Sequence, residues 1–184
     1  MFKILIIFFI LTFYTPAFSF VKDKIVSQMQ LTNNLSFNFI QMIDGQSEEG
    51  SCIIEYPKKI YCEYNNPKNK IMVSNGKSLV IKNRNKKNYY VYPLKNTPLK
   101  FLLDKNYLIS KINTLEPRNV NNKYLNFQIF ENDNRINIFF DIKTSLLTGW
   151  QTKDIYDNLT ITFISSIEVN KKINNKIFTL PENN

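Results

Sequence analysis

The sequence has 184 residues, 43% of them hydrophobic, and a formal net charge of +9 at pH 7. It contains no histidine and two cysteines, and none of the common hydrolase, metalloprotease or phosphate-loop motifs, which argues against an enzyme or a zinc site. The basic residues are scattered, without an arginine cluster or a nucleic-acid-binding motif, so they indicate a solvated surface rather than a nucleic-acid partner. We therefore expect a binding protein that uses no cofactor and no metal.

Residues 1–19 have the pattern of a cleaved export signal. Lys3 precedes an apolar run from Ile4 to Phe13, and a proline and small residues follow before position 20. The apolar run is shorter than the span of about 20 residues that crosses a bilayer, which disfavours the alternative of an uncleaved membrane anchor. We expect one exported domain over residues 20–184.

The periodicity of the chain predicts a mainly β (α+β) fold. An amphipathic helix is expected over residues 21–34, because Ile25, Val26 and Met29 share one helical face. From residue 35 onwards apolar and polar residues alternate, as they do in half-buried strands, and tight turns such as Asn75-Gly76 separate the alternating runs. The pattern predicts one large curved antiparallel sheet or barrel of about ten strands.

Large apolar and aromatic side chains gather on one face of the predicted sheet. A sheet of about ten strands tends to curl, which makes this face concave. The residues expected on it are Leu35, Phe37, Phe39, Cys52, Ile54, Tyr56, Ile60, Cys62 and Tyr64. Two interpretations remain open, because small barrels usually fill their interior with side chains, whereas a wider one encloses a cavity for an apolar ligand.

The two cysteines lie on the two arms of a hairpin predicted over residues 50–65. If the turn centres on Lys58, Cys62 faces Ile54 rather than Cys52. A disulfide and a pair of free thiols are therefore both compatible with the sequence.

A short helical segment interrupts the strands at residues 93–106. Thr97 is placed to cap a helix that begins at Pro98, where the missing N–H costs nothing. Three leucines then share one helical face, and a second short helix is expected directly after this one. The apolar concave face has to be covered by these helices, by a ligand or by both.

The order of short motifs resembles the LolA family of periplasmic outer-membrane lipoprotein carriers over nearly the whole exported domain. An amphipathic helix leads into a Phe-x-Phe-x-Gln strand, a Gly/Pro hairpin ends in Glu-Tyr, and a Pro and an Asn-Gly hairpin precede Thr-Pro-Leu. A Leu-x-x-Trp-x-x-x-Asp pattern and a terminal Phe-x-x-Pro follow. The residues that carry the resemblance are Phe37, Phe39, Gln41, Gly50, Pro57, Glu63, Tyr64, Pro67, Ser74, Asn75, Gly76, Lys77, Thr97, Pro98, Leu147, Trp150, Asp154, Phe178 and Pro181.

The resemblance implies an unclosed antiparallel β-barrel of ten or eleven strands with helices as a lid over a hydrophobic cavity for lipoprotein acyl chains. It implies a periplasmic monomer whose partners are acylated lipoproteins, an inner-membrane lipoprotein-releasing ABC transporter and an outer-membrane acceptor. The expected lid residues are Pro98, Leu99, Phe101, Leu102 and Leu103. The expected cavity residues are Leu35, Phe37, Phe39, Ile54, Tyr56, Ile60, Cys62 and Tyr64.

One position departs from the family pattern. Members of the family often carry an arginine before the hairpin proline, where it holds the lid closed, and this chain has Tyr56 there. A tyrosine offers one donor where a guanidinium offers several, so the lid is held less firmly or the cargo differs. The alternative is thus a LolA-like lipid-binding or envelope-sensing domain with different cargo.

Overall fold

A computed structural model describes residues 17–66, 69–87, 89–131 and 134–181, so residues 1–16 of the predicted export signal and Pro67 lie outside the described part. The elements in chain order are α1 (Ala17–Leu31), β1 (Asn34–Ile43), β2 (Gln46–Glu55), β3 (Lys59–Tyr64), β4 (Lys70–Asn75), β5 (Ser78–Asn83), β6 (Tyr89–Pro93), η1 (Leu94–Asn96), α2 (Leu99–Leu102), α3 (Lys105–Thr114), β7 (Arg118–Val120), β8 (Tyr124–Glu131), β9 (Asn134–Asp141), β10 (Leu147–Lys153), β11 (Leu159–Val169) and η2 (Asn175–Phe178).

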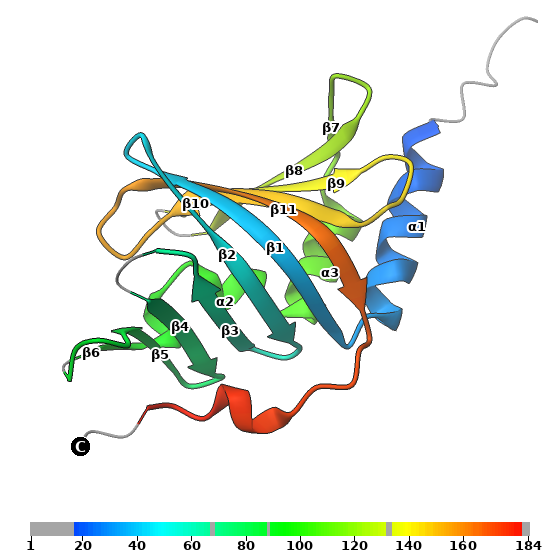
Figure 1. Ribbon diagram of the computed structural model, residues 1–184. Helices are drawn as coiled ribbons and strands as arrows, with labels where there is room; N and C mark the ends of the chain where they lie inside the picture. Colours follow the sequence, from blue (N-terminus) through cyan, green and yellow to red (C-terminus); the bar gives the residue numbers. More distant parts are fainter. Residues whose placement is uncertain (1–16, 67–68, 88, 132–133, 182–184) are drawn as a thin grey trace, which may run out of the picture.

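The described strands form one antiparallel sheet of eleven strands in the order β6-β5-β4-β3-β2-β1-β11-β10-β9-β8-β7. The end strands β6 and β7 are not paired with each other in the described residues, so the sheet curls without closing (Figure 1). Register shifts in β1 near Ser36 and in β10 near Leu147 interrupt the regular pairing, as bulges that bend a strand do. The predicted unclosed β-barrel is confirmed.

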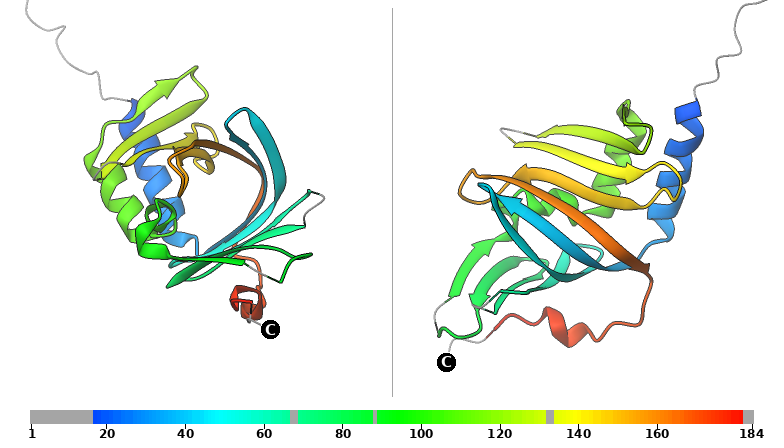
Figure 2. Two further views of the ribbon diagram at one scale, coloured as in Figure 1. Left: turned by 90° about the vertical axis from the view of Figure 1, so that its left-hand side faces the viewer. Right: turned by 45° about the horizontal axis from the view of Figure 1, so that its top comes forward.

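Helices α1, α2 and α3 lie on the concave side of the sheet, whereas η2 packs outside it against β3 and β4 (Figure 2). Helices α1 and α3 pack against each other, and the ammonium group of Lys105 donates to the carbonyl oxygen of Thr32 at 2.8 Å, which ties α3 to the end of α1. Buried side chains of both helices, such as Ile25 and Ile112, join the side chains of the sheet in one core. None of the helices within the described ranges is long and apolar enough to span a membrane.

Both glycine turns occur where the sequence predicts them. The β1–β2 hairpin turns at Asp44 and Gly45, which both have positive φ, as a tight two-residue hairpin requires. The β4–β5 hairpin turns at Gly76 and Lys77, directly after Asn75, and the Asn75 side-chain oxygen accepts from the backbone N–H of Lys77 at 3.0 Å. Local turn chemistry thus sets the register of these strands.

The predicted register of the cysteine hairpin is wrong by one residue. Cys52 lies directly opposite Cys62, and Ile54 lies opposite Ile60, because the turn centres on Pro57 rather than on Lys58. The two cysteines form a disulfide with a Cα–Cα distance of 4.1 Å, which excludes free thiols. The short strand β7 was not predicted, since three residues are too few to show alternation.

Reduction of this disulfide is expected to lower the free energy of unfolding by about 2–3 kcal/mol, because the bond closes a short loop of the unfolded chain. Urea unfolding with and without dithiothreitol measures the difference. The double variant Cys52→Ala/Cys62→Ala is the control, and its unfolding should not respond to the reductant. An identical midpoint for oxidised and reduced wild-type protein would show that the bond adds no stability.

Candidate functional site

A cavity of about 420 Å³ lies between the concave face of the sheet and the lid. Its walls come from strands on both sides of β1, from the loop between β10 and β11, and from the start of α2. Apolar and aromatic side chains form most of the wall. The apolar side chains of the wall include those of Phe39, Cys52, Ile60, Cys62, Met72, Leu79, Ile81, Leu99 and Trp150. The interior is therefore hollow rather than fully packed, in the size range of small-molecule sites.

Half of the eight residues predicted to line the cavity do so. Phe39, Ile60, Cys62 and Tyr64 contribute to its wall, and Cys52 lies beside them through the disulfide. Phe39 and Tyr64 meet edge to face with their ring centroids 5.0 Å apart. The strands β1 and β3 thus bring together side chains that are far apart in the sequence.

The other four predicted cavity residues lie elsewhere. Phe37 is buried behind Trp150, with the ring centroids 6.1 Å apart, and Ile54 is buried in the core. Leu35 and Tyr56 face a separate small gap beside α1 and α3. The reason is that the concave face is longer than the cavity, and the two helices fill the part near the start of β1.

The lid residues divide in a similar way. Pro98 and Leu99 line the cavity. Leu102 and Leu103 are buried in the core, and Phe101 packs on Tyr107 beside a second hollow on the outer side of the lid. Helix α2 has four residues, of which Leu99 lines the cavity and Leu102 is buried in the core, so the helix meets the cavity only at its start.

One expectation about the start of the lid is wrong, and one question that the sequence left open is answered. The Thr97 side chain does not cap α2, because its hydroxyl donates back to the carbonyl oxygen of Leu94 at 3.0 Å. Tyr56 makes no hydrogen bond to the lid within the described residues, and burial raises the pKa of its hydroxyl. Tyr56 therefore does not take the place of the arginine that holds the lid in the family.

Lys58, in the turn between β2 and β3, holds the lid instead. Its backbone N–H donates to the carbonyl oxygen of Leu103 at 2.8 Å. Its ammonium group lies 3.3 Å from the carboxylate of Asp104, which in turn caps α3 by accepting from the N–H of Tyr107. The ion pair is partly exposed and contributes little, so the lid is held by the burial of Leu102 and Leu103 together with the backbone hydrogen bond of Lys58.

Polar residues form the end of the cavity opposite the lid, and the sequence prediction missed them. Gln41, Thr152, Thr160 and Thr162 line this end, and Glu48 forms an ion pair with Lys70 at its edge. The signal was present in the alternation of β11, where Thr160 and Thr162 share the inward face with Ile164. The cavity is therefore amphipathic, with its apolar part under the lid.

A pair of tyrosines spans the mouth of the cavity. The hydroxyls of Tyr92, on β6, and Tyr156, in the loop between β10 and β11, lie 3.0 Å apart, and both residues line the cavity. Partial burial, together with the hydrogen bond to Tyr156, raises the pKa of Tyr92 to about 12, so the Tyr92 hydroxyl is neutral near pH 7. The contact joins two distant parts of the open sheet.

An open, curled sheet with an amphipathic cavity beneath a helical lid defines a class of proteins with an unclosed barrel around an internal cavity. The chain belongs to the LolA family, described as outer membrane lipoprotein carrier protein LolA, whose family model matches residues 20–181. The resemblance noted in the sequence is thereby confirmed. Among curated proteins, none matches the sequence.

Several solved structures share the fold at low sequence identity. An uncharacterized conserved protein from Thermus thermophilus is 6% identical, with a TM-score of 0.53 over 89% of this chain and 94% of that one. MucB is 7% identical, with a TM-score of 0.50 over 91% of this chain and 64% of that one. A LolA superfamily protein from Nitrosomonas europaea is 7% identical, with a TM-score of 0.47 over 88% and 97% of the two chains. At these identities the likeness concerns the fold alone.

Proposed function

We propose that the protein is a periplasmic carrier that holds lipoprotein acyl chains in its cavity and moves lipoproteins from the inner to the outer membrane. The observation that carries the proposal is the hollow beneath Leu99, lined by apolar side chains of β1, β3 and β5. Its partners would be acylated lipoproteins, an inner-membrane lipoprotein-releasing ABC transporter as the donor and an outer-membrane acceptor. The membership of residues 20–181 in the LolA family supports this role.

The size of the cavity sets a limit on what the closed form can hold. An apolar cavity of about 150 Å³ accommodates one benzene molecule, or roughly 25 Å³ per carbon. By this measure the 420 Å³ of the cavity correspond to roughly one acyl chain of 17 carbons. A triacylated anchor is larger, so the lid or the mouth has to move to admit it.

The free energy of hydration explains why such a carrier is needed. A triacylated anchor has on the order of 40 methylenes, and leaving them in water costs roughly 30 kcal/mol at about 0.8 kcal/mol each. A carrier has to bury most of the methylenes of the anchor and still release the anchor to the next membrane. The start of the lid suits this requirement, because Leu99 is only partly buried over the cavity, whereas Leu102 and Leu103 anchor the rest of the lid in the core.

The tyrosine pair at the mouth gives a kinetic prediction. Tyr156→Phe removes the hydrogen bond to Tyr92 and is expected to speed the release of a bound fluorescent fatty acid about twofold to fivefold, since an exposed neutral hydrogen bond is weak. Stopped-flow mixing with excess unlabelled fatty acid measures the rate. Tyr90→Phe is the control, because Tyr90 also lines the cavity but its hydroxyl makes no hydrogen bond within the described residues. Equal release rates for the two variants would contradict a role of the pair in holding the mouth closed.

A transfer assay tests the proposed function. Proteoliposomes that contain the inner-membrane transporter and a lipoprotein labelled in its acyl chains are incubated with ATP and the protein. We expect the label to move into the soluble fraction in a complex with this chain. Label that stays in the membrane, while the protein still binds free fatty acids, would favour a LolA-like domain for another lipid.

The alternative of an envelope-sensing domain has a separate test. Depletion of a carrier should leave outer-membrane lipoproteins behind in the inner membrane, which fractionation detects. Normal sorting together with an altered envelope stress response would favour the sensing role instead.

A further inference from the structure

The polar end of the cavity is built from four side chains on three adjacent strands, Gln41, Thr152, Thr160 and Thr162, which we call the polar wall. Thr152 on β10 lies directly opposite Thr160 on β11, and Thr162 lies between Gln41 on β1 and Trp150 on β10. The three threonines are at most 7% exposed and all of them line the cavity. The polar wall is therefore a defined part of the interior and not solvated surface.

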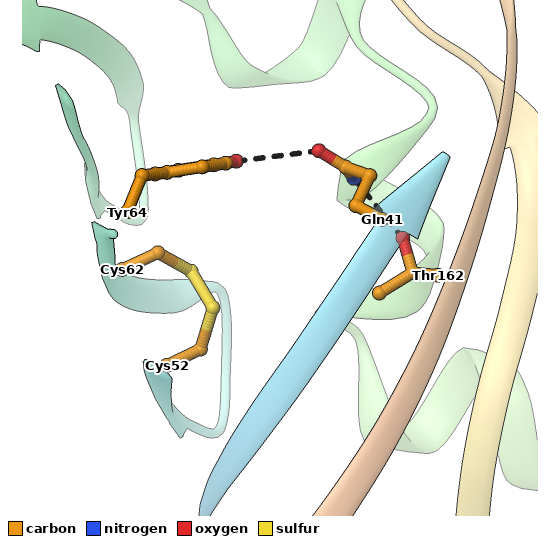
Figure 3. Close-up of a disulfide and its surroundings, with 5 residues drawn as sticks. All are labelled: Gln41, Cys52, Cys62, Tyr64 and Thr162. Atoms are coloured by element: carbon orange, nitrogen blue, oxygen red, sulfur yellow. Dashed lines mark hydrogen bonds between the residues drawn. A yellow bond between two sulfur atoms is a disulfide. The ribbon is translucent and has the colours of Figure 1, made fainter. Parts of the chain in front are cut away.

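The hydrogen bonds of the polar wall leave donors unused. The amide nitrogen of Gln41 donates to the Thr162 hydroxyl oxygen at 3.0 Å, and the Tyr64 hydroxyl donates to the Gln41 carbonyl oxygen at 3.5 Å (Figure 3). The hydrogen of the Thr162 hydroxyl then finds no acceptor within the described residues. The buried Thr152 hydroxyl has no hydrogen-bond partner there either. Buried polar groups normally have partners, so these two hydroxyls are available to donate to an acceptor that enters the cavity.

The order of residues along the strands gives the cavity a direction. Successive rows of cross-strand pairs run from the lid towards the loop between β10 and β11. The first row contains the disulfide, the next contains Phe39 and Tyr64, and the polar wall follows. The ion pair of Glu48 and Lys70 lies at the same end, since Glu48 is paired with Gln41. Hydrocarbon fits the end under the lid, and acceptor oxygens fit the opposite end.

We propose that the polar wall binds the ester carbonyl oxygens of an acylated glyceride, with the hydrocarbon chains directed towards the lid. The inference rests on the proposed function, because it specifies the chemistry of the ligand held in that cavity. An ester carbonyl accepts hydrogen bonds from hydroxyls, and a rotation of the Thr152 side chain about its Cα–Cβ bond turns its hydroxyl towards the ligand. The Tyr64 hydroxyl stays protonated near neutral pH, because burial, and to a lesser degree Glu48, raise its pKa.

Two lipids that differ only in their carbonyl groups test the polar wall. Dioctanoylglycerol has two ester carbonyls, whereas dioctylglycerol has ether linkages and the same chain length. We expect the full-length protein to bind the ester about tenfold more tightly in displacement of a fluorescent fatty acid, as two neutral hydrogen bonds allow. Thr152→Val and Thr162→Val should each reduce this preference several-fold.

The controls separate the loss of a hydroxyl from a loss of structure. Thr162→Ser keeps the hydroxyl and should keep the preference for the ester. Thr179→Val makes the same chemical change at an exposed residue outside the cavity and should change neither affinity. Equal affinity of the wild type for the two lipids, or an undiminished preference in both valine variants, would overturn the proposal while leaving the acyl-binding cavity intact. Binding of neither lipid would overturn the polar wall together with the proposed function.

Discussion

Leu99→Glu is expected to weaken the binding of a long-chain fatty acid at least about 100-fold, which corresponds to roughly 2.7 kcal/mol. Leu99 is the residue of α2 that lines the cavity, so the new carboxylate would lie against the hydrocarbon chain without a partner. A partly buried residue is suited to this test, because its replacement does not remove a side chain from the packed core. Titration of a fluorescent fatty acid measures the affinity.

Lys100→Glu is the matched control for Leu99→Glu. It places the same side chain on the next residue of α2, which faces the outer hollow, and it should leave acyl binding within about threefold of wild type. Leu102→Glu is not a useful alternative, because Leu102 is buried in the core and its replacement would test folding instead. Equal losses in the variants of Leu99 and Lys100, or no loss in either, would show that α2 does not cover the bound chain.

Gly50→Ala is expected to lower the free energy of unfolding by at least about 3 kcal/mol. A Cβ atom at this position would lie 2.0 Å from the carbonyl oxygen of Glu63 and 2.9 Å from the ring of Phe39. The first of these contacts is with backbone, so relief requires β2 and β3 to move apart. The rings of Phe39 and Tyr64, which flank Gly50 on the neighbouring strands, are in contact, so the same change would distort the cavity wall.

Urea unfolding followed by circular dichroism measures the effect of Gly50→Ala. Gly45→Ala is the control, since nothing lies within 4 Å of the added Cβ and only its positive φ opposes the change. We expect it to cost about 1 kcal/mol. If Gly50→Ala is no more destabilising than Gly45→Ala, the close approach of β2 and β3 is wrong.

Much of the fold could be predicted because it depends on local signals. Alternation identified the long strands, and Asp44-Gly45 and Asn75-Gly76 fixed two hairpins, since both depend on residues within a few positions of one another. The cysteine hairpin was misplaced because a turn of three residues around Pro57 gives no comparable signal for its centre. An error of one residue in the centre of the turn places Ile54 instead of Cys52 opposite Cys62. The disulfide forms only when Cys52 lies there.

The candidate site was harder to predict, because the cavity depends on how distant elements pack. Alternation placed Leu35 and Phe39 on the same face of β1, but only the packing of α1 and α3 separates the filled end from the hollow one. The role of Lys58 depends on the approach of the β2–β3 turn to Leu103. No local pattern in the sequence indicates that contact.

Photocrosslinking from inside the cavity tests the central claim most directly. A photoreactive phenylalanine analogue is placed at Met72, which lines the cavity, or at Phe163, which is 56% exposed on the convex face of β11. Each protein is produced in cells labelled with radioactive palmitate and is then irradiated. We predict that acylated lipoprotein crosslinks to the protein with the analogue at Met72 and does not crosslink to the protein with the analogue at Phe163. Crosslinks at Phe163 without crosslinks at Met72 would show that acyl chains bind outside the barrel and would contradict the carrier account.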